Sequence, residues 1–204
     1  MQFVENGPDI PDALLQAHEE GRVVFFCGAG ISYPAGLPLF KGLVEQVYEQ
    51  LGTSQTPDEK AAFESWQFDL TLNRLERRYI GGRTAARQAV ADKLQPKLDR
   101  QGATETHQAL LRLARTQGDC FRLVTTNFDR IFDTAADIIG HETTTYSAPL
   151  LPTPRNGQWD GLVYLHGRLP GTDGGSRALN DLVLTSSDFG RAYLTERWAA
   201  RFVK

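Results

Sequence analysis

Three short stretches of the sequence carry groups that could do chemistry, and they are Gly28-Ala29-Gly30, Asn127 with Asp129, and His166. Closely spaced glycines let the backbone turn tightly and expose its N–H groups, so an anion such as pyrophosphate can approach. An amide can orient a ligand, a carboxylate can accept a hydrogen bond, and a histidine titrates near neutral pH. Together these groups are the parts needed to hold a dinucleotide and to break a bond in it.

Each stretch also has a structural explanation. A glycine turn can simply reverse the chain, and the dinucleotide fingerprint Gly-x-Gly-x-x-Gly is incomplete because its last position is Tyr33. Asn127 and Asp129 belong to residue types that often cap a following helix, and a lone histidine such as His166 is often half-buried without a catalytic role. For the remaining histidines we favour surface or capping roles; they are His18, His107 and His141.

The apolar pattern predicts the strands that position these groups. Residues 23–27 form an unbroken apolar run, which is typical of a strand covered on both faces of a parallel sheet. Further strands are predicted at 121–126, 143–146, 162–165 and 182–185. The three stretches then follow the carboxyl ends of strands, which form the edge where open α/β sheets hold their ligands.

Helices are predicted at 9–20, 40–51, 104–116 and 189–203, and another begins near residue 128. Between residues 53 and 100 several helical stretches follow one another without a strand, although a plain crossover needs only one helix. Residues 168–181 have the composition of a glycine-rich polar loop. The sequence therefore predicts one domain over residues 1–204, of the α/β class, with a helical insertion at about 53–100.

Composition excludes several classes of partner. The net charge of -3 and the pI near 5.8 provide no basic field, so we expect no direct nucleic-acid binding by this segment. Cys27 and Cys120 are the only cysteines, which favours free buried thiols in a reducing cytosol and cannot supply a zinc quartet. The N-terminal residues lack the apolar run of a signal peptide, and no apolar stretch has transmembrane length. We expect a cytoplasmic domain without a metal ion or membrane contact.

Four motifs resemble those of the sirtuins, the NAD-dependent deacylases, in the order of that family. They are Gly28-Ala-Gly-Ile-Ser32, Ala35-Gly-Leu-Pro-Leu-Phe-Lys41, Thr126-Asn127-Phe-Asp129 and Leu165-His166-Gly167. The motifs Thr-Thr-Asn-Phe-Asp and Leu-His-Gly are most similar to those of the sirtuin-like domains of bacterial anti-phage defence proteins, which act as NAD hydrolases. The resemblance spans most of the chain and implies a Rossmann-like sheet.

The resemblance also implies roles for individual residues. It places Ala29, Gly30 and Ile31 along the NAD phosphates, with Gly28 and Ser32 in the same cofactor-binding stretch. It implies that Asn127 and Asp129 face the nicotinamide and its ribose, and that His166 is the general base. Asn127 and His166 are then the catalytic residues, and NAD is the substrate.

The sequence departs from the deacylating sirtuins in three places. Those proteins usually bind a structural zinc ion through two cysteine pairs, but the loop after Gly167 contains no cysteine, so we expect no zinc. Leu39-Phe40-Lys41 replaces their usual Asp-Phe-Arg, which affects the contacts on the nicotinamide side. The later strand that closes over adenosine is missing, and the predicted helix 189–203 is unusually apolar for a last helix. We therefore expect the chain to be C-terminally incomplete.

The expected function is hydrolysis of NAD to nicotinamide and ADP-ribose by the effector part of an anti-phage protein. The expected partners are a further C-terminal domain or a partner subunit that senses the phage, and further copies of the chain in a homo-oligomer of the full-length protein. Two alternatives stay open. One is an NAD-dependent protein deacylase, and the other is a module that binds a nucleotide or holds an oligomer together without turnover.

Overall fold

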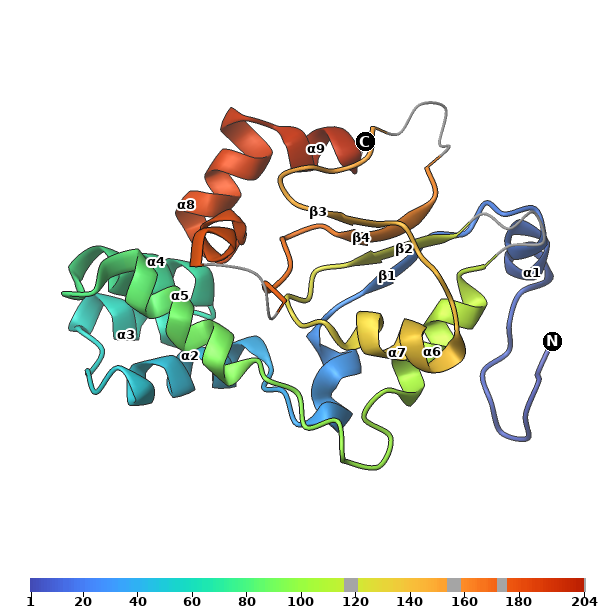
Figure 1. Cartoon of the computed structure of the whole chain (residues 1–204), viewed down its shortest axis with the longest axis horizontal. Helices are drawn as coiled ribbons and strands as arrows, with labels where there is room; N and C mark the ends of the chain where they lie inside the picture. The colour runs from blue at the N-terminus through green and yellow to red at the C-terminus, as the bar shows by residue number, and fades with distance from the viewer. Residues whose placement is uncertain (116–120, 154–158, 172–175, 204) are drawn as a thin grey trace.

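The computed structural model describes residues 1–115, 121–153, 159–171 and 176–203, apart from the side chains of 176–178. At the centre of this part of the chain lies a parallel sheet with the strand order β1-β2-β4-β3 (Figure 1). Its strands are β1 (Phe25–Cys27), β2 (Arg122–Thr125), β3 (Thr145–Ser147) and β4 (Gly161–Tyr164). Helices flank this sheet on both sides, which confirms the predicted α/β, Rossmann-like class.

One face of the sheet is covered by α6 (Glu105–Leu113) and α7 (Ile131–Ile139). Their apolar side chains pack with Cys27, Leu123 and Leu162 in one cluster. The other face is covered by a π-helical stretch, η3 (Gly190–Thr195), and by α9 (Trp198–Phe202), which pack against Val124 and Val163. Because both central strands are covered on both faces, their side chains are almost wholly buried.

The prediction that residues 23–27 form a strand buried on both faces was wrong in part. The strand is only Phe25–Cys27 and lies at the edge of the sheet. Cys27 is 5% exposed, but Phe26 pairs with Val124 on the face of η3 and α9 and is 62% exposed. The helices on that face cover Val124 and leave Phe26 open. An unbroken apolar run does not distinguish this edge position from a central one.

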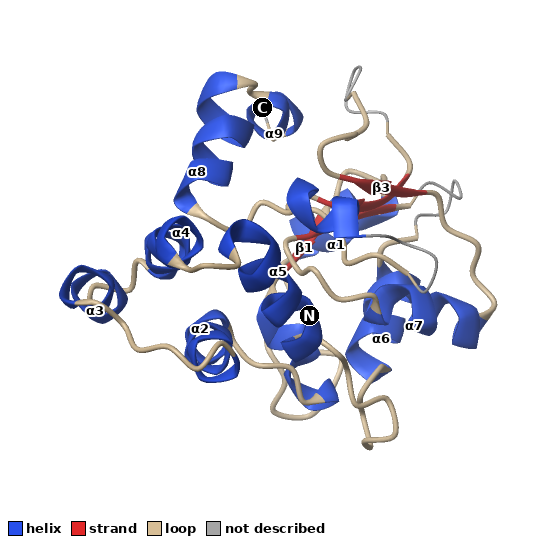
Figure 2. Cartoon of the chain, turned by 60° about the vertical axis from the view of Figure 1, so that its left-hand side comes forward, coloured by secondary structure: helices blue, strands red, loops and turns tan. Residues whose placement is uncertain are grey.

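Four helices form a separate layer beside the sheet (Figures 1 and 2). They are α2 (Phe40–Gln50), α3 (Pro57–Glu64), α4 (Phe68–Arg78) and α5 (Gly82–Lys93). A capping box begins α3, because Thr56 accepts a hydrogen bond from the N–H of Glu59 while the Glu59 carboxylate accepts one from the N–H of Thr56. These helices share a second core with Leu179, Leu182 and Leu184 from the segment after β4.

Other elements differ from the prediction in extent. The first helix, α1 (Asp12–Glu19), starts after Pro11 rather than at residue 9. Residues 182–184 form no strand, although the N–H of Val183 donates to the carbonyl oxygen of His166 at 2.8 Å. A 3₁₀ helix, η2 (Ser176–Asp181), occupies the end of the predicted polar loop. Residues 172–175 of that loop, and Cys120, lie outside the described residues.

The predicted helix 189–203 is divided. A short helix, α8 (Ser186–Phe189), continues directly into η3 with the hydrogen bonding of a π-helix, in which the N–H of Glu196 donates to the carbonyl oxygen of Arg191. Arg197 then adopts a left-handed conformation, with φ of 63°, before α9 begins. This break turns α9 back over the sheet (Figure 1). Within the described residues, no helix is long and apolar enough to span a membrane.

Candidate active site

A cavity of about 250 Å³ lies at the carboxyl ends of β1, β2 and β4. Its polar lining comes from the segments that follow these strands, namely Ser32, Thr126, Asn127, Asp129 and His166, and Ala29 lines it beside them. Its apolar wall comes from the glycine segment, the helical layer, the segment before α8 and α8 itself, with Leu37, Phe40, Leu43, Leu94, Val183 and Phe189. The tertiary fold thus brings together the three stretches that the sequence singled out, as expected where parallel strands end.

Ser32 links the two polar residues that follow β2. Its hydroxyl donates to Oδ2 of Asp129 at 2.8 Å, and it accepts a hydrogen bond from Nδ2 of Asn127 at 3.0 Å. Asn127 and Asp129 are 6% and 4% exposed, so these bonds are shielded from water. Ser32 stands in the first 3₁₀ helix, η1 (Ala29–Ala35), which follows the glycine turn directly. Through Ser32, the segment after the glycine turn therefore fixes the orientation of the Asn127 amide and the Asp129 carboxylate.

The helix-capping explanation applies to one of these residues and not to the other. Oδ1 of Asp129 accepts a hydrogen bond from the N–H of Ile131, the first residue of α7, at 3.1 Å. Burial raises the pKa of Asp129, and the hydrogen bonds from Ser32 and from the Ile131 N–H oppose that rise. Asn127 makes no such bond to α7. Its side chain turns toward Ser32 and the cavity instead.

Oδ1 of Asn127 is a buried acceptor without a hydrogen-bond partner among the described residues. Buried polar atoms are nearly always paired, so an unpaired one that lines a cavity calls for a donor from a ligand or from water. Because Nδ2 is already held by Ser32, Oδ1 stays in a defined direction. This atom is the most specific indication in the structure that the cavity binds a polar ligand.

His107 is a part of this site that the sequence reasoning missed. It is fully buried, with Nε2 3.4 Å from Oγ of Ser32 and its ring edge-on to Phe132. Burial lowers its pKa to about 4, so the ring is neutral at neutral pH. The expected surface or capping role was wrong. The spacing of His107, Leu111 and Ala114 on α6 and just beyond it marks one buried face and could have revealed this.

His166 also lines the cavity and follows β4 after one intervening residue, Leu165. Its Nε2 is 3.0 Å from the hydroxyl of Tyr193 in η3. The rings of His166 and Phe189 meet edge to face, with their centroids 5.1 Å apart. Burial lowers the pKa of His166 to about 4. The ring is therefore neutral near pH 7 and able to accept a proton. Tyr193 lies within the predicted apolar helix 189–203, where nothing in the sequence pattern indicated this contact.

The glycine segment leaves open space on either side of Ala29, which lines the cavity. A Cβ atom at Gly30 would meet no atom within 4 Å, and one at Gly28 would meet only Oγ1 of Thr126 at 3.7 Å. The side chain of Ile31 packs into the core under α6 and α7, so only its backbone can face a ligand. In the described part of the chain, no cluster of three His, Cys, Asp or Glu residues could hold a metal ion.

Comparison with known proteins agrees with this arrangement. Residues 122–204 match the family model of the SIR2-like domain, and this stretch contains Asn127, Asp129 and His166. An uncharacterized protein, y4cA of Sinorhizobium fredii (strain NBRC 101917 / NGR234), is 38% identical over 208 residues, which cover all of this chain but 17% of that protein. The chain thus spans about a sixth of the length of this relative. The match supports a sirtuin-like domain, and SIR2-like domains are typically NAD-dependent enzymes.

Proposed function

We propose that this domain hydrolyses NAD to nicotinamide and ADP-ribose, with Asn127 and His166 as its catalytic residues. The observation that carries the proposal is the unpaired Oδ1 of Asn127 in the same cavity as a neutral His166. One group can orient a hydroxyl or a water molecule, and the other can accept its proton.

The cavity fits the part of NAD at which the bond is cleaved. Its apolar wall, which includes Phe40, Leu43 and Phe189, suits a flat aromatic ring such as nicotinamide. The polar groups lie together at the strand ends, where they can meet the hydroxyls of a ribose. The open space beside Gly30 leaves a path for the rest of the dinucleotide.

The chemistry needs a base and a positioning group. Cleavage of an N-glycosidic bond passes through a state like an oxocarbenium ion, by analogy with glycoside hydrolysis. The pyridinium group of NAD already leaves readily, so no acid is required. His166 takes a proton from water or from a ribose hydroxyl, and Asn127 holds the reacting group in place. Asp129 acts through Ser32, whose hydroxyl keeps the Asn127 amide in its orientation.

We also propose that the domain is the effector of a larger anti-phage protein. The support is the resemblance of the Asn127 and His166 motifs to defence-associated domains, and an alignment that covers a small fraction of a much longer relative. In this proposal another domain or subunit senses the phage, and copies of the chain assemble into an oligomer. Infection assays of cells that carry the complete gene, with wild type and His166→Ala, test it: protection that survives the substitution would contradict it.

The enzymatic proposal is tested by incubating the protein with NAD and measuring nicotinamide and ADP-ribose by chromatography with mass spectrometry. We expect both products in equal amounts, and a loss of about two to four orders of magnitude in His166→Ala. His141→Ala is a matched control, because His141 lies outside this cavity. O-acetyl-ADP-ribose formed with an acetylated peptide would indicate a deacylase instead. Calorimetric binding of NAD without release of nicotinamide would indicate a binding module.

A further inference from the structure

Tyr193 is the one side chain in the described structure that hydrogen bonds to the ring of His166. Its hydroxyl lies 3.0 Å from Nε2, and its ring stacks on that of Phe189 with an interplanar angle of 22°. Tyr193 is in the π-helical stretch η3, and such stretches often occur at functional sites. The side chain of Tyr193 packs against the apolar cluster under η3, and its hydroxyl reaches His166, which lines the cavity.

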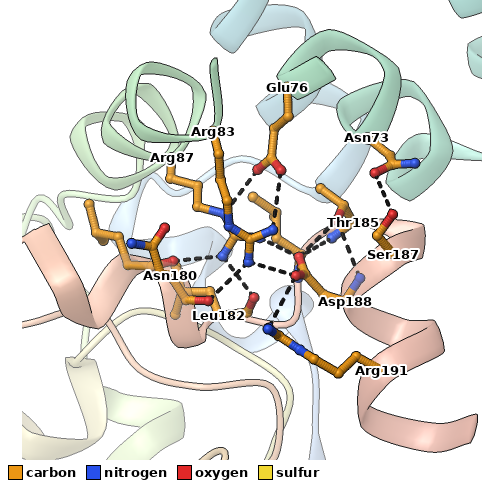
Figure 3. A network of polar contacts seen from close by, with 12 residues as sticks. Asn73, Glu76, Arg83, Arg87, Asn180, Leu182, Thr185, Ser187, Asp188 and Arg191 are labelled. Carbon is orange, nitrogen blue, oxygen red and sulfur yellow. Dashed lines mark hydrogen bonds and ion pairs between the residues drawn. The ribbon is translucent and has the colours of Figure 1, made fainter. Parts of the chain in front are cut away.

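The helix that carries Tyr193 is anchored at its start by a buried ionic network, drawn in Figure 3. Asp188 is 2% exposed, and its carboxylate accepts hydrogen bonds from Arg83 and Arg87 of α5 and from the backbone N–H groups of Leu184 and Thr185. Arg87 in turn donates to Glu76 at 2.9 Å. Since Asp188 immediately precedes Phe189, this network holds the first turn of the helix against the helical layer. The position of Tyr193 is thus set by tertiary contacts rather than by a free helix end.

The hydrogen bond to Tyr193 restricts which nitrogen of His166 can act as a base. A neutral imidazole carries a hydrogen on one nitrogen and a lone pair on the other. The Tyr193 hydroxyl can accept from Nε2–H or donate to a bare Nε2. Once His166 has taken up a proton, both nitrogens carry hydrogens and Nε2–H must donate. Only an accepting tyrosine keeps its hydrogen bond before and after the proton moves.

Nδ1 is the nitrogen that remains. It makes no hydrogen bond within the described residues, and the side chain of His166 is only half-buried and lines the cavity. We infer that Tyr193 is a positioning residue that accepts the Nε2–H hydrogen bond of His166 and thereby leaves Nδ1 as the atom that receives the proton in the cavity. The catalytic part of this inference rests on the proposed NAD hydrolysis.

The substitution Tyr193→Phe tests the inference, because it removes the hydroxyl and keeps the stacked ring. Nitrogen NMR of protein labelled with ¹⁵N-histidine distinguishes the two tautomers of His166 and follows its titration. The titratable groups near His166 are Tyr193 and, in the same cavity, Asp129. We expect the Nε2–H tautomer in the wild type. In Tyr193→Phe the Nδ1–H form should appear, and the titration midpoint should fall by roughly half a unit to one unit, since a hydrogen bond to the charged ring is stronger than one to the neutral ring.

Activity provides the second measurement. Tyr193→Phe should lower kcat for nicotinamide release by roughly ten- to a hundredfold and change KM by less than about twofold, because the base is misdirected while the cavity is unchanged. Tyr146→Phe is the matched control, since Tyr146 is also half-buried in the cluster under η3 and makes no contact with the cavity. It should leave kcat, KM and the His166 signals as in the wild type.

The outcomes separate this inference from the proposed function. Wild-type protein that releases no nicotinamide, but whose His166 tautomer shifts on Tyr193→Phe, would refute NAD hydrolysis and support the positioning role. A lower kcat with an unchanged tautomer and midpoint would overturn the inference and show that Tyr193 acts only through packing. If the Tyr193→Phe protein lost its cooperative thermal transition, it would not be folded, and the wild-type spectrum would be the test. An Nδ1–H tautomer of His166 in the wild type would contradict the inference that Tyr193 accepts from Nε2–H.

Discussion

At the residue scale, the site depends on how a few side chains divide their hydrogen bonds. Asp129 uses one carboxylate oxygen for Ser32 and the other for the first N–H of α7, whereas the side chain of Asn127 bonds only through its amide nitrogen among the described residues. Both oxygens of the Asp129 carboxylate are thus already hydrogen-bonded within the protein. The amide oxygen has no partner among the described residues.

This division predicts opposite effects for two neighbouring substitutions. Asn127→Ala should reduce NAD hydrolysis by roughly two orders of magnitude or more and lower the free energy of unfolding by about 1 kcal/mol or less. Asp129→Ala removes a helix-start hydrogen bond and the acceptor for Ser32, so it should cost about 1–3 kcal/mol of stability. Urea unfolding beside product measurement checks both. A large loss of stability in Asn127→Ala would mean that its role is structural.

The buried His107 predicts a pH dependence of stability. Its pKa is lowered from 6.5 to about 4 in the folded protein, so between these pH values the unfolded chain binds a proton that the folded chain does not. The stabilising effect of the neutral ring is complete above about pH 6.5 and is lost as the pH falls toward 4, by on the order of 3 kcal/mol. His107→Gln should show a smaller loss of unfolding free energy than the wild type between pH 7 and 4.5. Parallel pH curves for the two proteins would contradict this.

At the element scale, the helical layer is joined to the last helices by buried charges (Figure 3). Arg87 is fully buried between Glu76 and Asp188 and also donates to the carbonyl oxygens of Leu179 and Leu182. Burial raises the pKa of Glu76. Burial also tends to raise the pKa of Asp188. The positive charge of Arg87 and the hydrogen bonds from Arg83 and Thr185 outweigh this effect, so the pKa of Asp188 is lowered. The network therefore depends mainly on Arg87.

Removing this arginine should be among the most destabilising single changes. Arg87→Ala leaves two carboxylates buried without their main partner, which costs roughly 3–5 kcal/mol. Arg83→Ala is the matched comparison, because Arg83 contacts the same two carboxylates but its side chain is 34% exposed, and it should cost much less. Chemical unfolding of both variants measures the difference. Equal costs would show that the two arginines share the role.

The glycine segment supports a second prediction at this scale. Gly30→Val should fold normally, because the new Cβ would meet no atom within 4 Å from elsewhere in the described structure. If the dinucleotide passes along this segment, the branched side chain occupies its path and the Kd for NAD rises. Titration calorimetry with thermal melting separates the two effects. An unchanged Kd would place the dinucleotide elsewhere.

At the scale of the whole molecule, one part of the sheet has no covering layer from the described residues. β1 is an edge strand, and Val24 and Phe26 are 44% and 62% exposed beside it. Exposed apolar edges of this kind favour pairing with another chain. We expect concentration-dependent self-association that Phe26→Lys reduces. Ile138→Lys is the control, because Ile138 is 58% exposed on a helix. Sedimentation velocity of the three proteins measures this, and equal association of wild type and Phe26→Lys would refute it.

The sequence by itself determined where the site would assemble. Strand patterns placed the glycine turn, Asn127 and His166 after the carboxyl ends of parallel strands, and those ends necessarily meet at one edge of a sheet. The apolar periods also located α2 correctly, at Phe40–Gln50, because its buried face repeats along the chain. These features are local, so a single sequence can reveal them.

The tertiary structure alone decided which side chains serve this site. Ser32 meets Asp129 across 97 positions of sequence and His107 across 75, and Tyr193 reaches His166 from a helix whose break at Arg197 no periodicity indicated. The exposure of Phe26 likewise depends on how far η3 and α9 extend over the sheet. Such contacts join segments that are distant in sequence, and residue type and spacing within each segment carry no information about its partner. Packing of the layers determines them.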